Sequence, residues 1–518
     1  MKRHLGTGIA GALLGTAVAV SASVGPAGAT DGYFQVGFGA RQNALGGAGV
    51  ADSTDAMAQT LNPAGIVGVG DQWQIGGAVF MPYRGYEATG AGFVARPSVD
   101  SDANIFVMPN FALIRQIDEQ SAWGISVYGN GGMNTTYANV ANAACGGGSG
   151  VFCGGVSGVD LMQAFISLDY ARQAGPVKIG IAPTLAVQRF QAKGLVAFSG
   201  FSADPTNLTD NGYDYSFGGG LRAGLEWEAM PGLRFGLSGQ TKMYMTKFEK
   251  YAGLFADQGS FDIPAAVTAG VAFDATPDLT LMLDYQRIFY SGVGSIGNSG
   301  SVPLLFGSSG GPGFGWDDVN VIKVGAEWKA NDTWTLRAGY AYSDNPVGPE
   351  DVTLNILAPG IVQHHITAGA SYKLSERDTV EFFGMYVPET KVSGPEIAII
   401  VPTYNESGNV AELIRRIGET LDGIAWEVIV VDDDSADGTA DIVNRLARDN
   451  HRVRCIHRIG RRGLSTACIE GFLSSSAPYL AVIDGDLQHD ERLLAEMLQQ
   501  LRTGDYDIVV GSRYVDGG

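Results

Sequence analysis

Acidic and amide side chains gather in three clusters in the last quarter of this 518-residue sequence. In one cluster, two aspartates stand at positions i and i+2, a spacing that can hold a divalent cation against a diphosphate because hard cations take oxygen ligands. A single Asp-x-Asp is more often a solvated turn, but three such clusters in succession favour a nucleotide-diphosphate site. The clusters are Pro402-Thr-Tyr-Asn-Glu406, Asp432-Asp-Asp-Ser435 and Asp484-Gly-Asp-Leu-Gln-His489.

Buried strands must position these clusters, and each cluster follows a short apolar run rich in β-branched residues. Runs of this kind are typical of strands that are covered on both faces of a parallel sheet. Apolar residues with helical spacing separate the runs, so the section is predicted to be α/β, with ligands at the carboxyl ends of its strands. The predicted strands are 397–401, 428–431, 479–483 and 508–510.

Five motifs in this section together resemble the family 2 glycosyltransferases, in particular the dolichol-phosphate mannosyltransferase-like branch with its GT-A (Rossmann-like) fold. The resemblance implies transfer of a hexose from a nucleotide-sugar (a GDP- or UDP-hexose) to a polyprenyl phosphate. It also implies Mg²⁺ or Mn²⁺ as the cofactor that neutralises the departing diphosphate. The motifs are 402–406, 431–435, 463–467, 484–489 and Gly511-Ser-Arg-Tyr514.

The resemblance assigns roles to individual residues. Asp434 departs from the family pattern, which usually has Gly or Asn there, while His457 and His489 are expected to be structural. The implied nucleotide-binding residues are Pro402, Tyr404, Glu406, Asp432 and Asp433. The implied catalytic residues are Asp484, Asp486 and Arg513, and the implied metal ligands are Asp486 and Gln488.

Composition changes sharply at Pro395. Of 50 aromatic residues, 44 lie before Glu396, and so do 62 of the 74 glycines, whereas no lysine follows Lys391. The first three-quarters of the chain therefore belong to another structural class. The net charge of −20 argues against a nucleic-acid partner.

An export signal is predicted at residues 1–29. Met1-Lys-Arg-His4 is a basic start, residues 5–20 are apolar, and Ala27-Gly-Ala29 is a small-x-small cleavage site. The alternative, an uncleaved membrane anchor, fits less well because the apolar stretch is short and rich in glycine.

Beyond the signal, stretches of about ten residues alternate between apolar and polar side chains. Residues 321–329 and 333–342 are examples in which aromatic residues join the apolar face. In the first, Ile322 and Trp328 lie on the apolar face and Lys323 lies on the polar face. This pattern indicates a transmembrane antiparallel β-barrel, although a soluble β-sandwich also alternates. The 13 candidate strands are 72–81, 103–115, 122–129, 161–172, 177–190, 214–228, 232–248, 263–274, 278–290, 318–329, 332–343, 362–373 and 378–387.

Residues 30–70 do not alternate; they are rich in small residues and contain Asn62-Pro63-Ala64-Gly65. With later motifs, this segment resembles the FadL/TodX family of outer-membrane transporters, in which such a hatch plugs a 14-stranded barrel. The resemblance implies uptake of long-chain fatty acids or other hydrophobic compounds, without catalysis or a cofactor, in the lipid of a Gram-negative outer membrane. The later motifs are Pro183, Gly315-Trp-Asp317, Trp334-Thr-Leu-Arg-Ala-Gly-Tyr340 and His365-Ile-Thr-Ala-Gly-Ala-Ser-Tyr372.

The four cysteines form two sets. Cys145 and Cys153 flank a glycine-rich loop and could form a disulfide after export, or could stay unpaired. Cys455 and Cys468 lack metal-site spacing and are expected to be small buried residues.

We therefore expect a signal (1–29), a hatch (30–70), a barrel (71–393) and the N-terminal half of a glycosyltransferase domain (396–518). Residues 391–395 stand where the family has a closing strand, and the C-terminal section is expected in the periplasm, at odds with its chemistry. Two alternatives are that the chain acts as a glycosyltransferase, or that two truncated frames are fused with neither activity intact.

Overall fold

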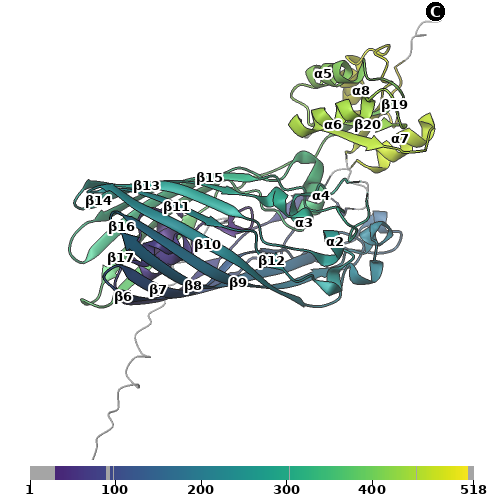
Figure 1. Ribbon diagram of the computed structural model, residues 1–518. Helices are drawn as coiled ribbons and strands as arrows, with labels where there is room; N and C mark the ends of the chain where they lie inside the picture. Colours follow the sequence, from purple (N-terminus) through teal and green to yellow (C-terminus); the bar gives the residue numbers. More distant parts are fainter. Residues whose placement is uncertain are drawn as a thin grey trace, which may run out of the picture.

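The computed structural model describes residues 30–88, 94–96, 98–302, 304–450, 452–475 and 477–511. The predicted export signal and Arg513 lie outside these residues. The described chain forms a large antiparallel sheet curved into a barrel and a smaller parallel sheet covered by helices (Figure 1).

The large sheet has 16 strands, and each of its long strands pairs with the next one along the chain. Three of the 16 are two-residue strands: β1 (Thr30–Asp31), β2 (Phe34–Gln35) and β12 (Tyr244–Met245). Each of the other 13 strands overlaps one of the predicted strands, with ends that differ by a few residues in most of them. They are β3 (Gln72–Phe80), β6 (Phe106–Asp118), β7 (Ser121–Asn134), β8 (Gly158–Ala174), β9 (Val177–Lys193), β10 (Asp214–Met230), β11 (Leu233–Gln240), β13 (Ala266–Thr276), β14 (Leu279–Ile288), β15 (Val319–Lys329), β16 (Trp334–Ser343), β17 (His364–Lys373) and β18 (Thr379–Tyr386).

The alternation of the sequence determines the two faces of this wall. In β15, Ile322 and Trp328 point outward and are about half exposed, whereas Lys323 and Glu327 are buried on the inner face. Apolar side chains outward and polar ones inward are what a strand between lipid and a polar lumen requires.

One predicted strand, 232–248, is interrupted. β11 ends at Gln240, and β12 resumes pairing with β10 after a shift of one residue in the register. Met243 bridges Ile263 across the same interruption, so the stretch bends without leaving the sheet.

The long loops carry short elements. These are β4 (Gly85–Glu87), β5 (Ser98–Asp100), α2 (Ala256–Gly259), α3 (Gly294–Gly297), α4 (Val352–Asn355), η3 (Ala143–Cys145), η4 (Val196–Phe201), η5 (Pro205–Asn207), η6 (Glu249–Tyr251), η7 (Tyr290–Gly292) and η8 (Pro349–Asp351).

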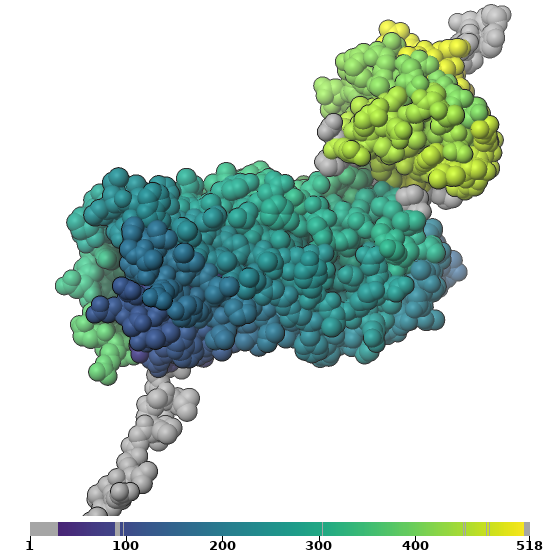
Figure 2. All heavy atoms as spheres, viewed as in Figure 1, coloured from purple at the N-terminus to yellow at the C-terminus, as the bar shows by residue number. Residues whose placement is uncertain are grey.

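The position of the C-terminal section differs from the expectation of a periplasmic location. Short turns and long loops alternate between the strands, and β18 starts after a short turn, at 374–378, so it ends where the long loops lie. Outer-membrane barrels have short turns on the periplasmic side and long loops outside. Because 13 is an odd number, β3 and β18 run in the same direction, and residues 387 onward leave the barrel at the long-loop end. The C-terminal section lies at that end, near α3 and α4 (Figures 1 and 2).

The hatch, residues 30–70, lies inside the barrel, drawn in purple in Figure 1. It contains β1, β2, α1 (Ala40–Ala44) and two 3₁₀ helices, η1 (Ala56–Thr60) and η2 (Pro63–Ile66). α1 packs against β16, β17 and β18, and η2 packs against β8, β9 and β10. Nearly all of its side chains between residues 39 and 67 are buried, so the segment fills the lumen.

The C-terminal section has a four-stranded parallel sheet in the order β21-β20-β19-β22. Apolar clusters cover both faces of the sheet, as the β-branched runs predicted. Among the described residues, no helix is long and apolar enough to cross a membrane. The elements are β19 (Ile397–Thr403), α5 (Val410–Thr420), β20 (Trp426–Asp432), α6 (Thr439–Asp449), β21 (Val453–His457), α7 (Leu464–Leu473), β22 (Tyr479–Val482) and α8 (Leu493–Arg502).

The fourth strand of this sheet was predicted wrongly. Residues 508–510 are not in a strand, and Ile508 and Val510 are highly exposed. β21 takes the fourth place, where Arg454 pairs with Glu427 of β20 at 2.7 Å. As an edge strand with charged residues, β21 lacks the continuous apolar run that marked the buried strands.

Candidate functional site

The Asn62-Pro63-Ala64-Gly65 motif anchors the hatch to the barrel wall. Asn62 caps η2, since its Oδ1 accepts a hydrogen bond from the Ala64 amide at 3.0 Å. The Asn62 Nδ2 donates to the Val50 carbonyl oxygen within the hatch (2.7 Å) and to the Leu225 carbonyl oxygen in β10 (3.0 Å). Asn62 is fully buried, so each bond is shielded from water. One side chain thus fixes a turn and joins two segments 163 residues apart.

Glycines in the wall leave room for this motif. A Cβ atom on Gly224 would lie 1.9 Å from the Asn62 Oδ1, and one on Gly180 would lie 2.3 Å from the Pro63 carbonyl carbon. Such distances are shorter than atoms can approach, so any side chain at either position would displace η2. The glycines at these positions of the wall therefore leave the space in which the hatch packs.

A buried chain of charges links the hatch to three strands of the barrel wall, β11, β15 and β16. Arg234 in β11 contacts Asp52 of the hatch at 2.7 Å, and Asp52 also pairs with Arg41. The Arg41 Nε lies 2.8 Å from Glu327 Oε2 in β15, and Glu327 pairs with Arg337 in β16 at 2.6 Å. Alternating signs keep each buried charge next to an opposite one, as buried ions require.

Further polar side chains of the wall hold the backbone of the hatch. The Asp284 Oδ2 accepts hydrogen bonds from the Gly49 and Val50 amides at 2.8 and 2.9 Å. Arg222 donates to the Gln59 carbonyl oxygen, and the Lys323 Nζ donates to the Val36 carbonyl oxygen at 3.1 Å. Sequence reasoning placed Lys323 on the polar face of a strand, but alternation alone could not name its partner.

Two cavities flank the hatch. A small one of about 40 Å³ lies in the lumen between Phe34, Phe38 and Arg222. A large one of about 1280 Å³ opens at the long-loop end and reaches Tyr33 of the hatch. Arg84 lines the large cavity, and burial lowers its pKa to about 10. The large cavity, here called the vestibule, lies between the hatch, the long loops and the C-terminal section, which contributes Glu396 and Ala425.

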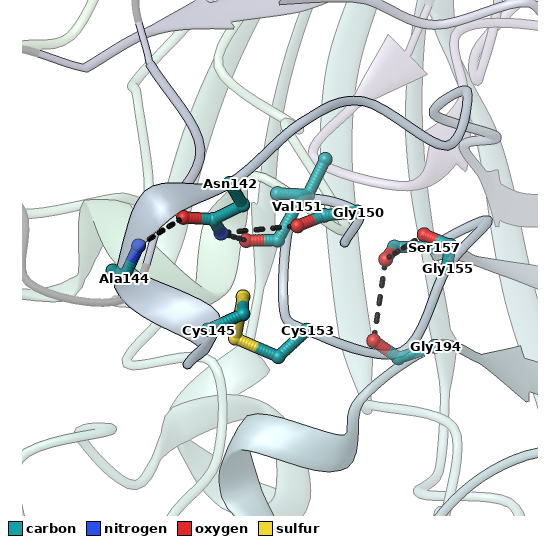
Figure 3. The surroundings of a disulfide bond; sticks show 9 residues. All are labelled: Asn142, Ala144, Cys145, Gly150, Val151, Cys153, Gly155, Ser157 and Gly194. Atoms are coloured by element: carbon teal, nitrogen blue, oxygen red, sulfur yellow. Dashed lines mark hydrogen bonds between the residues drawn. A yellow bond between two sulfur atoms is a disulfide. The ribbon is translucent and has the colours of Figure 1, made fainter. Parts of the chain in front are cut away.

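A disulfide closes one of the long loops. Cys145 and Cys153 are bonded, with their Cα atoms 5.3 Å apart, so the pairing that the sequence left open is formed (Figure 3). Asn142 lies beside it and donates to the Gly150 and Val151 carbonyl oxygens. The loop is therefore held by both a covalent link and a side-chain network.

The second candidate site lies at the carboxyl ends of β19, β20 and β22. Asp432 is fully buried and accepts hydrogen bonds from Thr403 and from the Ser435 amide and hydroxyl. It therefore ties the end of β19 to the loop that follows β20. Glu406 accepts from Asn409 at the start of α5, at 2.8 Å.

Asp433 is held more tightly than the sequence indicated. Arg458 donates to the Asp433 Oδ1 at 2.5 Å, and the Gly463 amide donates to its Oδ2 at 2.6 Å. Arg458 is itself buried and also donates to Thr466. The guanidinium of Arg462 lies 4.2 Å from the ring centroid of Tyr404, which is about half exposed. Arg458 and Arg462 were missed because they follow a strand that the sequence did not reveal.

Of the predicted metal ligands, Gln488 is exposed and Asp486 is partly exposed, and the predicted catalytic residue Asp484 is exposed beside them. The side chain of Asp484 is half exposed, and its Oδ2 lies 3.9 Å from the His489 Nδ1. The Asp486 Oδ1 accepts a hydrogen bond from the backbone amide of Gln488 at 3.0 Å. In the described residues, no group of three or more His, Cys, Asp or Glu side chains is placed to hold a metal ion. Two carboxylates and one amide oxygen still fit a hard cation whose remaining ligands come from a diphosphate.

Hydrogen bonds and burial set two unusual pKa values near this site. Burial raises the pKa of Asp437, but hydrogen bonds from Thr439 and Ser407 prevail and hold it at about 2. Burial raises the pKa of Cys455 to about 12, so this thiol is unreactive at neutral pH. Cys455 and Cys468 are both free and partly buried, as expected of small packing residues.

Comparisons with known proteins divide the chain in the same place. A family model described as outer membrane protein transport protein (OMPP1/FadL/TodX) matches residues 19–397. A second model, glycosyl transferase family 2, matches residues 398–518. The first match therefore ends at residue 397 and the second begins at residue 398, which are the first two residues of β19.

Individual relatives agree with this division. The toluene transporter TodX of P. putida covers 67% of this chain and 91% of its own, with 19% identity and a TM-score of 0.50. A FadL homologue of Pseudomonas aeruginosa covers 69% and 91%, with 14% identity and a TM-score of 0.51, so both show the fold. The dolichol-phosphate mannosyltransferase of Pyrococcus furiosus is 41% identical over 123 residues, 24% of this chain and 34% of that relative's length.

Proposed function

We propose that this chain, which belongs to the outer membrane protein transport protein family (OMPP1/FadL/TodX), admits long-chain fatty acids or other hydrophobic compounds through the outer membrane. The chain joins a transport channel for hydrophobic compounds to a family 2 glycosyltransferase domain. The observation that carries the proposal is the hatch, which fills the lumen and is tethered by side chains of the wall.

The tethers explain selectivity. η2 packs against Gly180 and Gly224, and the hatch fills the lumen of the described barrel, so polar solutes should be held back. A hydrophobic compound collects in the vestibule because transfer of apolar surface out of water is favourable. Passage then requires local movement of the hatch and no energy source on the barrel itself.

Uptake by intact Gram-negative cells tests this function. Cells that express the full chain should take up a long-chain fatty acid or a monoaromatic hydrocarbon faster than cells without it. Uptake of a polar sugar of similar size should not change, because the hatch blocks an aqueous pore. Equal acceleration of sugar and hydrocarbon would indicate an open pore and contradict the proposal.

A second candidate function is donor binding by the C-terminal section. Tyr404 and Asp433 come together at the carboxyl ends of adjacent strands, with Pro402 and Glu406 beside them, which supports binding of the nucleoside part of a GDP- or UDP-hexose. Asp486 and Gln488, next to Asp484, would hold Mg²⁺ or Mn²⁺, which supplies positive charge against the diphosphate. Hexose transfer to a polyprenyl phosphate is the reaction that these motifs imply.

Calorimetry on the full chain tests donor binding. GDP and UDP are titrated in the presence of Mn²⁺, first into the unchanged chain and then into an Asp433→Asn variant. Binding that weakens in the variant supports the assignment. Equal binding to both chains, or no binding of either nucleotide, would remove Asp433 from the donor site.

A further inference from the structure

The barrel wall has two free edges in the described part of the chain. β3 pairs only with β6, and β18 pairs only with β17, so a gap, here called the seam, separates β3 from β18. Backbone groups cannot stay unpaired in lipid, where no water replaces the missing partner. Both edges therefore need a partner in the membrane.

One polar contact already crosses the seam. The Gln74 Nε2 in β3 donates to the Glu381 Oε2 in β18 at 3.0 Å. Both side chains are also held from the lumen, since the Met57 amide donates to the Gln74 Oε1 and Ser371 donates to the Glu381 Oε1. α1 of the hatch packs against both β3 and β18 behind this contact. The two edges are thus held facing each other.

This contact defines a register in which the two strands match. If Gln74 stands opposite Glu381, then Gln72 stands opposite Thr379, and both are the first residues of their strands. Every residue of β18 then has a partner in β3, from position 72 to position 79. A shift of one residue would oppose inward and outward side chains, which strand pairing does not tolerate.

The outward faces agree with the same register. Ile75 is 59% exposed and would stand opposite Phe382, which is 36% exposed. Both are apolar and lie on the lipid face of the wall, next to the inward pair Gln74 and Glu381. A parallel pair is required because both strands run from the short-turn end to the long-loop end.

We propose that β3 and β18 close the barrel directly, as a parallel pair with Gln74 opposite Glu381. Membrane barrels with an odd number of strands exist, so a parallel seam is compatible with the bilayer. The closing ladder has evenly spaced, slanted hydrogen bonds, unlike the antiparallel ladders of the rest of the wall. No further strand is needed, and the chain after Val387 is free to leave at the long-loop end.

Engineered disulfides test the register in the full chain. Cys455→Ser and Cys468→Ser remove the free thiols, and Ile75→Cys is combined with Phe382→Cys. Facing residues of paired strands lie within the Cα distance of a disulfide, whereas a two-residue offset adds about 6.6 Å along the strand. Ile75→Cys with Val380→Cys is therefore the matched control. Trp73→Cys with Val380→Cys samples the proposed register a second time, in case the first pair prevents assembly.

After mild oxidation of isolated outer membranes, mass spectrometry of the peptides measures the disulfides within one chain. The in-register pairs should form at least about five times more intramolecular disulfide than the offset control. Three results would overturn the proposal: a dominant offset pair, disulfides mainly between two copies, or an assembled barrel in which no pair reacts. Disulfides between copies would mean that the edges pair with a second molecule.

Discussion

Arg41 and Glu327 form an ion pair of 2.8 Å between the hatch and the barrel wall, although 286 residues separate them in the sequence. Both side chains are almost fully buried, and each has a second partner of opposite charge. Removal of one member of a buried pair typically costs about 3–5 kcal/mol. Without Arg41, Glu327 still pairs with Arg337 and Asp52 still pairs with Arg234, so the loss here should lie at the lower end of that range.

The Arg41→Met variant should therefore loosen the hatch without unfolding the barrel. We expect the free energy that holds the hatch in the lumen to fall by about 3 kcal/mol. Single-channel recordings in planar bilayers should then show openings that the unchanged chain lacks. Arg115→Met is the control, since the Arg115–Asp71 pair is about half exposed and contributes little. Equal conductance of the Arg41→Met and unchanged chains would show that this pair does not hold the hatch.

A methyl group on Gly180 should also displace the hatch. The added Cβ would lie 2.3 Å from the backbone of Pro63, and overpacking of this kind costs about 1–3 kcal/mol. Gly180→Ala should raise the rate at which protease cleaves the hatch in detergent. Gly384→Ala is the matched control in the same wall, because no atom lies within 4 Å of its added Cβ. Similar cleavage rates in the two variants would argue against close packing of Pro63 on Gly180.

The stability of one long loop should depend on pH through Asp351. Burial raises the pKa of this carboxyl to about 7, against the lowering effect of the Ser299 hydrogen bond. Because the folded pKa is above the unfolded value, the folded loop binds more protons between about pH 4 and pH 7. Its stability should therefore fall as pH rises through this window and stay constant above it.

Hydrogen exchange of the Gly300 amide measures this dependence, since that amide donates to the Asp351 Oδ1 at 2.7 Å. After correction for the intrinsic exchange rate, protection should be greater at pH 5 than at pH 7.5. An Asp351→Asn variant retains an acceptor oxygen and should lose the pH dependence. If protection of the Gly300 amide changes with pH equally in both chains, a group other than Asp351 causes the pH dependence.

Arg458 should control nucleotide binding by orienting Asp433. If the C-terminal section binds GDP, Arg458→Met should weaken binding by about tenfold, or about 1.4 kcal/mol, because Asp433 loses its charged partner. Arg458→Lys keeps a positive charge and should restore part of the affinity. Arg415→Met on the exposed face of α5 is the control. Calorimetry gives the three Kd values, and an unchanged Kd for Arg458→Met would exclude this role.

The odd number of strands predicts an external location for the C-terminal section. In intact cells, a polymer-linked maleimide too large for the outer membrane should label an exposed Ser465→Cys variant with Cys455 and Cys468 replaced by serine. Label on Glu119→Cys, in the short turn between β6 and β7, should appear only after the cells are broken. Labelling in the reverse order would place the C-terminal section in the periplasm.

The sequence by itself determined which strand residues of the barrel face outward or inward, and to which structural class each section of the chain belongs. Alternation placed Ile322 outward and Lys323 inward, because a strand between lipid and lumen allows no other arrangement. The motif from Asp484 to His489 likewise marked the C-terminal section, since its chemistry needs those residues at that spacing. Such features depend on neighbours in the chain.

Only the tertiary structure decided which distant groups meet. The pairing of Arg41 with Glu327 depends on how the curved wall surrounds the hatch, and no local pattern encodes that distance. Sequence reasoning did not find β21 because this edge strand lacks a continuous apolar run. Its Arg454 instead pairs with Glu427 on the neighbouring strand β20. The direction in which β18 ends depends on the whole strand count, which is a property of the barrel and not of any segment.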